Sequence, residues 1–304
     1  TKKIKIGMLG NLVPISNPLR VAEEYAMIDV MSEGRLIAGL MRGIPHEYVA
    51  YNFSPDESRA RLAEAMRFIV KAWTEPEPFG WEGEFYSYPA VSIWPRPRQQ
   101  PHPPIMVSAS NEDSARFAAE ARVIMGMAFL PNLVIAKEVV DTYRDHAQKT
   151  GWTPTTDHVL ISCNTLIGED ETEIKNHLRE GIRYFGQVLL GGPRTAQKLV
   201  VQKSRYFRKK DYATEFTGRV SNIRERTLDE GIEDGVILCG TPDQVVQQIK
   251  RVHSELGAGW ININMKIGNV PNDVVKRSME LFRDHVLPHV RDLGDGGVIA
   301  GAGD

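Results

Sequence analysis

Short apolar segments alternate with amphipathic segments along nearly all 304 residues of this chain, and this alternation constrains the fold most strongly. The segment at 36–41 is almost continuously apolar, which is typical of a strand buried on both faces of a sheet. We count six such predicted strands, at residues 4–8, 36–41, 105–107, 123–125, 159–166 and 260–265. Strands that alternate with helices along a chain form a parallel sheet, so we expect an α/β fold.

The segments between these strands carry apolar residues at helical spacing. Leu62, Met66, Ile69 and Trp73 follow one another at intervals of four, three and four residues, which predicts a helix with one buried face. The same spacing predicts buried faces at Leu19, Ala22, Ala26 and Val30, at Val245, Ile249, Val252 and Leu256, and at Val275, Met279, Phe282 and Val286. Further helices are expected at 110–121, 134–148 and 171–188, and a capping box with proline at the first helical position is expected at 241–244.

Three stretches depart from the alternation. Residues 83–97 are aromatic and proline-rich, and we expect an excursion there in the form of a hairpin. Residues 190–235 contain a basic run, for which a solvated lid and a contact to a substrate or cofactor phosphate are the alternatives; the run is Lys203, Arg205, Arg208, Lys209 and Lys210. The glycine-rich residues 293–304 are expected to form a flexible tail.

Composition excludes several classes of protein. Hydrophobic residues make up 42% of the chain and charged residues 25%, which is ordinary for a soluble globular protein. The net charge of −2 provides no positive electrostatic field that would attract nucleic acid or an anionic membrane. No apolar run approaches the roughly 20 residues that span a bilayer. Two cysteines, Cys163 and Cys239, cannot form a disulfide framework, so we expect buried, reduced thiols in a cytoplasmic protein.

Arg42 directly follows the predicted strand at 36–41, and Gly43 follows Arg42. In a barrel of parallel strands, chemistry takes place at the carboxyl ends of the strands. A guanidinium there offers a planar set of donors to a phosphate or an anionic ring edge, and glycine lets a ligand approach the backbone. The alternative is a structural ion pair between Arg42 and a nearby carboxylate such as Glu47.

Ser110, Asn111 and Ser114 follow the predicted strand at 105–107 and open a helix. The free N–H groups and the dipole at a helix start attract phosphate, and the two hydroxyls add donors. The alternative is a simple helix cap, a role that suits Ser110 or Asn111. Glu112 and Asp113 would place negative charge beside a phosphate, so we expect their side chains to point away from it.

Two histidine positions are candidates for chemistry. His46 is the candidate acid or base because the pKa of imidazole lies near neutral pH; the alternative is a surface histidine. His285 and His289 stand four residues apart on a predicted helix, but the sequence shows no third ligand, so we expect no metal site.

Several of these segments together resemble the bacterial luciferase-like family of flavin-dependent monooxygenases. The matching segments are residues 7–14, 17–24, 29–35, 39–43, 46–48, 58–59, 240–245 and 281–288, so that the resemblance covers roughly residues 1–292. It implies a TIM barrel, (β/α)8, formed as a single domain by residues 1–292. It also implies that Met41 and Arg42 contact reduced FMN, that Leu9 and Gly10 lie against the flavin ring through a cis peptide bond, and that Ser110, Asn111 and Ser114 bind the flavin phosphate.

The chain departs from the family pattern in two places. Asn17 stands where the family usually has histidine before the proline of its third helix. The first residues match the third strand of the family, so we expect the chain to lack the first two β/α units, or about 60–90 residues of an eight-stranded barrel.

The resemblance implies a flavin-dependent monooxygenase that uses reduced FMN and O2 on an apolar organic substrate. We expect a separate flavin reductase as partner, a homodimer, and no nucleic acid or membrane partner. Two alternatives remain open: an oxidoreductase of the same fold that uses the deazaflavin F420, and a non-catalytic flavin-binding or partner subunit.

Overall fold

The computed structural model describes residues 2–128, 132–189, 204 and 227–294. Most of the predicted lid at 190–235, including its basic run, and most of the predicted tail lie outside these residues. The chain divides into two compact units. Among the described residues, the first unit contains 2–108 and 204, and the second unit contains 109–128, 132–189 and 227–294.

The first unit contains three parallel strands: β1 (Ile6–Gly7), β2 (Leu36–Leu40) and β5 (Ile105–Ser108). β2 pairs with β1 on one side, where Leu36 lies opposite Ile6, and with β5 on the other, where Ala38 lies opposite Ile105. All five residues of β2 are buried, which confirms the prediction from its apolar composition.

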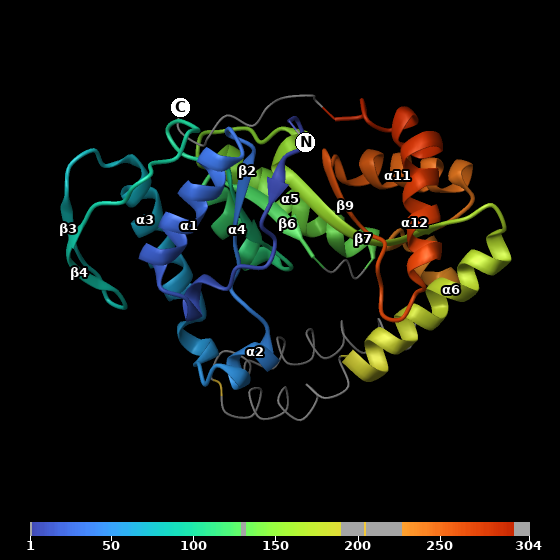
Figure 1. The fold of residues 1–304 in the computed structure, drawn as a ribbon, viewed down its shortest axis with the longest axis horizontal. Coiled ribbons are helices and arrows are strands. Elements are labelled where there is room, and N and C mark those ends of the chain that lie inside the picture. Colours follow the sequence, from blue (N-terminus) through green and yellow to red (C-terminus); the bar gives the residue numbers. More distant parts are fainter. Residues whose placement is uncertain (1, 129–131, 190–203, 205–226, 295–304) are drawn as a thin grey trace. The chain divides into compact units, whose positions relative to one another are not determined.

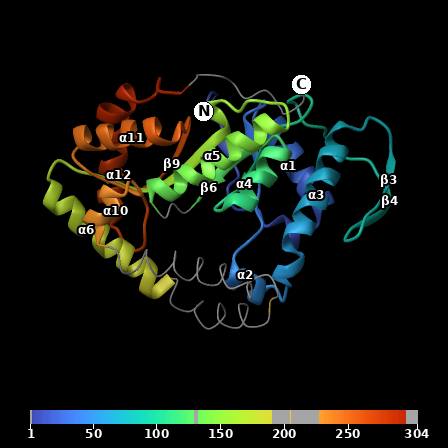
Figure 2. The ribbon, with the colours of Figure 1, turned by 180° about the vertical axis from the view of Figure 1, so that it is seen from behind.

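Two long helices of the first unit, α1 (Pro18–Met31) and α3 (Ser58–Thr74), pack against each other (Figures 1 and 2). The predicted face of α3 is buried, and the indole N–H of Trp73 donates a hydrogen bond to the Ala22 carbonyl at 2.9 Å. The predicted face of α1 is wrong at its two ends, because Leu19 is half-buried and Val30 is exposed. The buried face includes Asp29 instead, whose carboxylate accepts hydrogen bonds from the backbone N–H and the amide of Gln99 at 2.9 and 2.6 Å.

A hairpin is confirmed, but it begins before the expected segment at 83–97: β3 (Phe79–Glu82) and β4 (Ser87–Val91) form a separate antiparallel pair. The buried carboxylate of Glu64 on α3 holds the hairpin. It accepts hydrogen bonds from the backbone N–H groups of Phe85 and Tyr86, both at 3.0 Å, and from the indole of Trp81 at 3.3 Å. A buried carboxylate is stable when donors satisfy it in this way.

The second unit is built on β7 (Val159–Ile167), which pairs in parallel with three other strands. They are β6 (Ile124–Met127), β8 (Ile237–Gly240) and β9 (Trp260–Asn264). β8 was not predicted, because its four residues form a very short apolar run directly before a helix cap. Cys163 and Cys239 are buried free thiols on β7 and β8, as expected, and burial raises the pKa of both to about 12.

The helices of the second unit mostly follow the sequence pattern. They are α4 (Glu112–Glu120), α5 (Leu133–Lys149), α6 (Glu171–Tyr184), α10 (Leu228–Glu233), α11 (Pro242–Leu256) and α12 (Asn272–Leu281). α4 and α5 lie side by side in both views (Figures 1 and 2). The predicted face of α11 is buried, and the side chain of Gln244 accepts the Thr241 N–H at 2.8 Å, as a capping box requires.

The predicted face of the last helix is wrong in its centre. Met279 is exposed and Phe282 is half-buried, whereas Val275, Ser278, Leu281 and Val286 are buried. Within α12 the buried positions Val275, Ser278 and Leu281 follow one another at intervals of three. From Phe282 to Val286 the chain forms a π-helix, and the next buried position, Val286, comes five positions after Leu281.

Apart from the hairpin, every strand pair that the structure describes within either unit is parallel, which confirms the expected α/β class. The eight-stranded closure, the single domain over residues 1–292 and the lack of two β/α units stay predictions. No helix in the described ranges is long and apolar enough to cross a membrane.

Candidate active site

The carboxyl ends of β1, β2 and β5 lie at one edge of the sheet of the first unit, because the three strands are parallel. Leu9 and Gly10 follow β1, and Met41 and Arg42 follow β2. The structure therefore brings these four predicted site residues to the same edge. This is the edge at which parallel α/β proteins bind ligands.

The segment after β1 passes very close to β2. A Cβ atom on Gly39 would lie 1.7 Å from the Met8 carbonyl oxygen, so no other residue fits at this position without moving the backbone. Beyond Gly39, the Met41 N–H donates to the Asn11 carbonyl at 2.8 Å, and the Val13 N–H donates to the Met41 carbonyl at 3.1 Å. These two bonds fix the course of residues 9–13 relative to Met41.

The two strand ends differ in exposure. The side chain of Met41 is 8% exposed, whereas Leu9 is 39% exposed and a Cβ on Gly10 would meet no atom within 4 Å. Residues 9 and 10 thus offer an open surface to a planar ligand, whereas the side chain of Met41 lies in the core.

The hypothesis of a cis peptide bond between Leu9 and Gly10 is wrong for this structure. In the described ranges the cis bonds are Trp94–Pro95 and Gln100–Pro101, both before proline. The trans form at Leu9–Gly10 agrees with the strong preference of non-proline peptide bonds for trans.

Tyr48 fixes the backbone on the other side of Met41. Its hydroxyl lies 2.9 Å from the Gly43 carbonyl and 3.3 Å from the Arg42 carbonyl, to which it can donate. Gly43 has a φ of 99°, a left-handed conformation that favours glycine. The Glu47 carboxylate accepts the Ile44 N–H at 2.7 Å and so caps α2 (Pro45–Ala50). Arg42 is half-buried at the start of this loop.

The sequence placed Tyr48 within the family resemblance but gave it no role. Tyr48 stands five residues after Gly43 at a strand end, and this spacing could have indicated its role in holding the loop. We name Gly39, Met41, Gly43 and Tyr48 together the strand-end clamp, because they hold the loop that carries Arg42.

The acid–base role of His46 stays a prediction. His46 belongs to α2, but its side chain lies outside what the structure describes. Tyr25, the buried hydroxyl beneath this edge, is not a substitute. It donates to the Gly39 carbonyl at 2.6 Å, and burial raises the pKa of Tyr25 to about 12, so it stays protonated.

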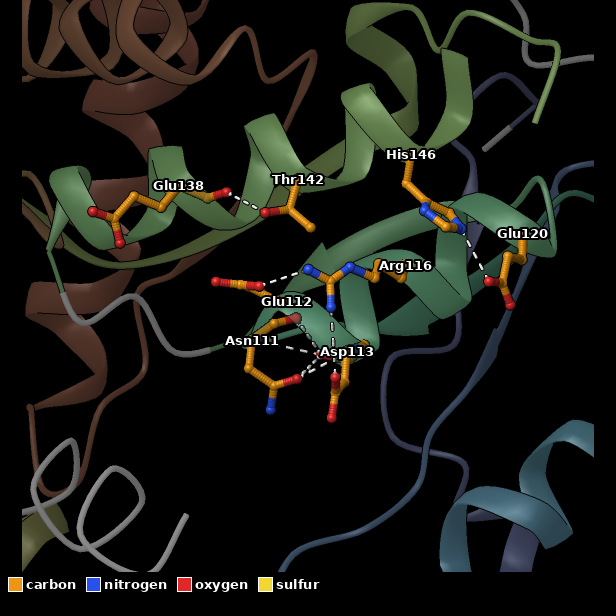
Figure 3. A network of polar contacts seen from close by, with 9 residues as sticks. Asn111, Glu112, Asp113, Arg116, Glu120, Glu138, Thr142 and His146 are labelled. Carbon is orange, nitrogen blue, oxygen red and sulfur yellow. Dashed lines mark hydrogen bonds and ion pairs between the residues drawn. The ribbon is translucent and has the colours of Figure 1, made fainter. Parts of the chain in front are cut away.

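In the second unit, Ser110, Asn111 and Ser114 form a hydrogen-bond network at the start of α4, where Figure 3 labels Asn111. The Asn111 side chain accepts the Ser114 N–H at 3.0 Å. The Ser114 hydroxyl accepts the N–H groups of Ser110 and Asn111 at 3.0 and 3.2 Å. We name these three residues the cap network. Locally, the structure shows the helix-cap alternative, in which these side chains satisfy donors of their own helix.

The acidic side chains at the start of α4 contact Arg116, a residue that the sequence analysis did not single out. The Arg116 guanidinium lies 2.8 Å from the Glu112 carboxylate and 3.9 Å from that of Asp113 (Figure 3). One turn further along, Glu120 contacts His146 of α5 at 2.9 Å. Arg116 therefore offsets part of the negative charge that would oppose a phosphate at the first turn of α4. A basic residue four positions after Glu112 is the sequence signal for this pair.

Backbone bonds fix where α4 begins. The Ala109 N–H donates to the Gly126 carbonyl at 2.8 Å, and Gly126 on β6 lies opposite Leu160 on β7. The cap network follows Ala109 immediately, so it lies toward the carboxyl end of the sheet of the second unit.

Other parts of the second unit offer less chemistry. A cleft of about 220 Å³ borders Ile261 and Ile263 of β9, with Asp157, His253 and Arg291 at its wall. Within the described ranges, no group of three or more His, Cys, Asp or Glu side chains could hold a metal ion.

Comparison with known proteins identifies a family that the sequence matches. The sequence profile of the family described as luciferase-like monooxygenase matches residues 1–258. The alkanal monooxygenase alpha chain of Photobacterium leiognathi is 22% identical over 297 residues, which are 96% of this chain and 81% of that protein. The oxygenase component of the flavin-dependent trigonelline monooxygenase of Acinetobacter baylyi is 32% identical over 123 residues, which are 40% of this chain. The chain spans 34% of the length of that protein.

Solved structures share the fold. Monooxygenase RslO1 from Streptomyces bottropensis is 28% identical, with a TM-score of 0.72 over 95% of this chain and 79% of that one. The oxygenating constituent of 3,6-diketocamphane monooxygenase from Pseudomonas putida, in complex with FMN, has the same TM-score at 20% identity over 95% and 80% of the two chains. An F420-dependent secondary alcohol dehydrogenase superposes with a TM-score of 0.69 at 16% identity over 96% and 81%. The described α/β fold is thus of the TIM-barrel type.

Proposed function

The chain belongs to the luciferase-like monooxygenase family, and from this premise we propose that it is the oxygenase of a two-component system. In this proposal it uses reduced FMN and O2 on an apolar organic substrate. The observation that carries the proposal is the position of Arg42: it follows β2 at the carboxyl edge of the sheet, on a loop that the strand-end clamp holds. A cation on a rigid loop suits the recognition of an anionic cofactor.

The residues present fit a flavin mononucleotide. Leu9 and Gly10 offer an open apolar surface for a ring, and Arg42 offers a guanidinium for negative charge. At the first turn of α4, backbone N–H groups and the helix dipole suit a phosphate, with the cap network holding that turn. Bound reduced flavin would supply the electrons that activate O2.

The chain itself would orient and shield the cofactor. Met41 and the backbone bonds to Asn11 and Val13 would keep the surface at Leu9 and Gly10 in place. His46 is proposed to move a proton during the reaction, and the segment at 190–235 to exclude water as a lid.

An F420-dependent oxidoreductase is the second candidate. The structural similarity to an F420-dependent secondary alcohol dehydrogenase, at a TM-score of 0.69, favours it. F420 also carries a planar ring and a phosphate, so the same donors fit both cofactors. A non-catalytic flavin-binding or partner subunit is the third alternative.

The proposed partners follow from relatives. The trigonelline monooxygenase relative is named as an oxygenase component, which supports a separate flavin reductase for this chain. We also propose a homodimer in the cytoplasm, without a nucleic-acid or membrane partner.

Reconstitution with each cofactor tests the proposal. The chain is titrated with FMN and with F420, and oxygen uptake is then followed with a flavin reductase and NADH over a panel of apolar substrates. Saturable FMN binding with substrate-dependent oxygen uptake supports the monooxygenase. Selective F420 binding with no oxygen uptake supports the second candidate, and FMN binding without oxygen uptake on any substrate supports the third.

A further inference from the structure

The side chain of Arg61, in the first turn of α3, lies among aromatic rings. Its guanidinium carbon lies 4.7 Å from the centre of the Phe85 ring, 5.4 Å from that of Phe53 and 5.9 Å from that of Tyr86. The guanidinium also donates a hydrogen bond to the Glu57 carboxylate at 2.9 Å. A cation within about 6 Å of a ring centre is attracted by the π electrons of the ring. We name Arg61, Phe53, Phe85 and Tyr86 the aromatic cage.

The aromatic cage joins three separate segments of the first unit. Arg61 belongs to α3, Phe53 belongs to the segment after α2, and Phe85 and Tyr86 belong to the turn between β3 and β4. One turn further along α3, the buried carboxylate of Glu64 accepts the backbone N–H groups of the same turn. Because Glu64 anchors this turn, the Phe85 ring is a fixed support for the guanidinium.

Phe53 connects the aromatic cage to the strand-end clamp. The centres of the Phe53 and Tyr48 rings are 5.9 Å apart, and the two ring planes are tilted by 44°. The Phe53 N–H also donates to the Tyr48 carbonyl at 2.8 Å. The Tyr48 hydroxyl in turn lies 2.9 Å from the carbonyl of Gly43, the residue after Arg42. A continuous chain of contacts therefore runs from Arg61 to the loop that carries Arg42.

The position of this loop depends on the orientation of the Tyr48 ring. Two backbone bonds hold Met41 on one side of Arg42, whereas the Tyr48 hydroxyl holds the other side. The Tyr48 ring is buried, so the groups that pack against it set its orientation. The Arg61 side chain is only 27% exposed, and a cation–π contact that is partly removed from water contributes more than an exposed one. Loss of Arg61 would therefore remove part of the support of Phe53 and let the Tyr48 ring turn.

We propose that Arg61 is a positioning residue for Arg42. Arg61 fixes Phe53 against the Tyr48 ring, and the Tyr48 hydroxyl fixes the loop of Arg42. The inference rests on the proposed function, because it explains how that enzyme holds the cation that binds its cofactor. Arg61 does not contact the cofactor itself, and the turn of the hairpin supports the cofactor loop through the aromatic cage.

Amide hydrogen exchange of the chain without cofactor tests whether the aromatic cage holds this loop. Arg61→Gln and Phe53→Leu both break the cage, and Phe53→Leu keeps the ion pair of Arg61. Both variants are expected to raise exchange at residues 42–50 about threefold, the effect of one partly exposed cation–π contact, and to leave β2 at 36–40 unchanged. Arg67→Gln replaces an exposed arginine of α3 and is the control. An equal rise in both peptides would indicate a general loss of stability and contradict the positioning role.

A double-mutant cycle tests the link from Arg61 to Arg42. Arg61→Gln alone is expected to weaken FMN binding about threefold, measured by flavin fluorescence. In a chain that already carries Arg42→Ala, the same change should leave FMN affinity unchanged, because the loop then holds no cation to position. Arg67→Gln should leave FMN affinity unchanged in both backgrounds.

The outcomes separate the possible failures. Unchanged exchange at residues 42–50 in both cage variants overturns the proposal. A loss of FMN affinity that persists in the Arg42→Ala background also overturns it, because Arg61 would then contact the cofactor itself. If exchange responds as expected but the wild-type chain binds no FMN, the positioning of the loop is supported and the proposed function fails. If the wild-type chain binds FMN and neither measurement responds to Arg61→Gln, the proposed function stands and the positioning role is overturned.

Discussion

Met41 of the strand-end clamp in the first unit and the cap network of the second unit were both predicted as cofactor contacts, yet their atoms are held in different ways. In the clamp, distant parts of the chain fix one loop: Met8 lies against Gly39, and the Met41 N–H donates to the Asn11 carbonyl. In the cap network, residues within five positions satisfy one another. The clamp therefore depends on tertiary packing, whereas the cap network depends only on residues close together in the sequence.

The largest expected effect is on the clamp. Gly39→Ala would place a methyl group 1.7 Å from the Met8 carbonyl oxygen, so the strands must separate. We expect the free energy of unfolding to fall by about 3 kcal/mol or more. Urea unfolding measures it. Gly10→Ala is the control and should change the free energy by less than about 0.5 kcal/mol, because a Cβ there meets no atom within 4 Å. Equal midpoints for the two variants would contradict the close approach.

The next effect concerns the cation that the clamp holds. Arg42→Ala should weaken FMN binding about tenfold or more, since a charge-assisted hydrogen bond contributes about 1.5–3 kcal/mol. Flavin fluorescence measures the dissociation constant. Arg67→Ala removes an exposed arginine of α3 and should leave it unchanged. If both variants bind FMN like the wild-type chain, Arg42 pairs within the protein and not with the cofactor.

The cap network is expected to respond in two ways at once. Ser114→Ala removes the acceptor of two backbone N–H groups, so stability should fall by about 1 kcal/mol. FMN binding should weaken about threefold, because the first turn of α4 loses its fixed geometry. Ser254→Ala on α11 is the matched control. Loss of stability without any loss of FMN affinity would show that this network caps the helix and does nothing else.

The smallest effect tests how the clamp positions Arg42. Tyr48→Phe removes a hydroxyl that lies near two carbonyls and should lower stability by about 0.5–1 kcal/mol. FMN affinity should fall about twofold, since Arg42 keeps its charge but loses part of its support. Tyr51→Phe changes an exposed side chain of the same region and serves as the control. A larger loss of affinity than in Arg42→Ala would mean that Tyr48 itself contacts the cofactor.

Sequence patterns predicted those parts of the fold that depend on local periodicity. The buried faces of α3 and α11 and the strand β2 follow from spacing and composition alone. The failures have tertiary causes. Asp29 is buried because Gln99, 70 residues away, satisfies its carboxylate. In the last helix, Ser278 is buried in place of Met279, and its hydroxyl accepts the Ile167 N–H, 111 positions earlier in the chain.

The residues of the candidate site also fall into those that local sequence patterns predicted and those that depend on tertiary contacts. The sequence predicted Arg42 as a cation that follows a strand. It predicted the cap network as polar residues that precede a helix. The role of Gly39 was not visible, because it depends on the backbone of Met8, 31 positions earlier in the chain. The aromatic cage was also missed, since it brings together Phe53 and Phe85, which are far apart in the sequence.

Amide hydrogen exchange with and without FMN tests the central claim most directly, because it reports on both regions in one experiment. FMN is expected to slow exchange in peptides covering residues 8–13, 40–48 and 109–115, and to leave exchange in the hairpin at 79–91 unchanged. Saturating FMN with no added protection at 8–13 or at 40–48 would contradict the assignment of the strand-end clamp to the cofactor.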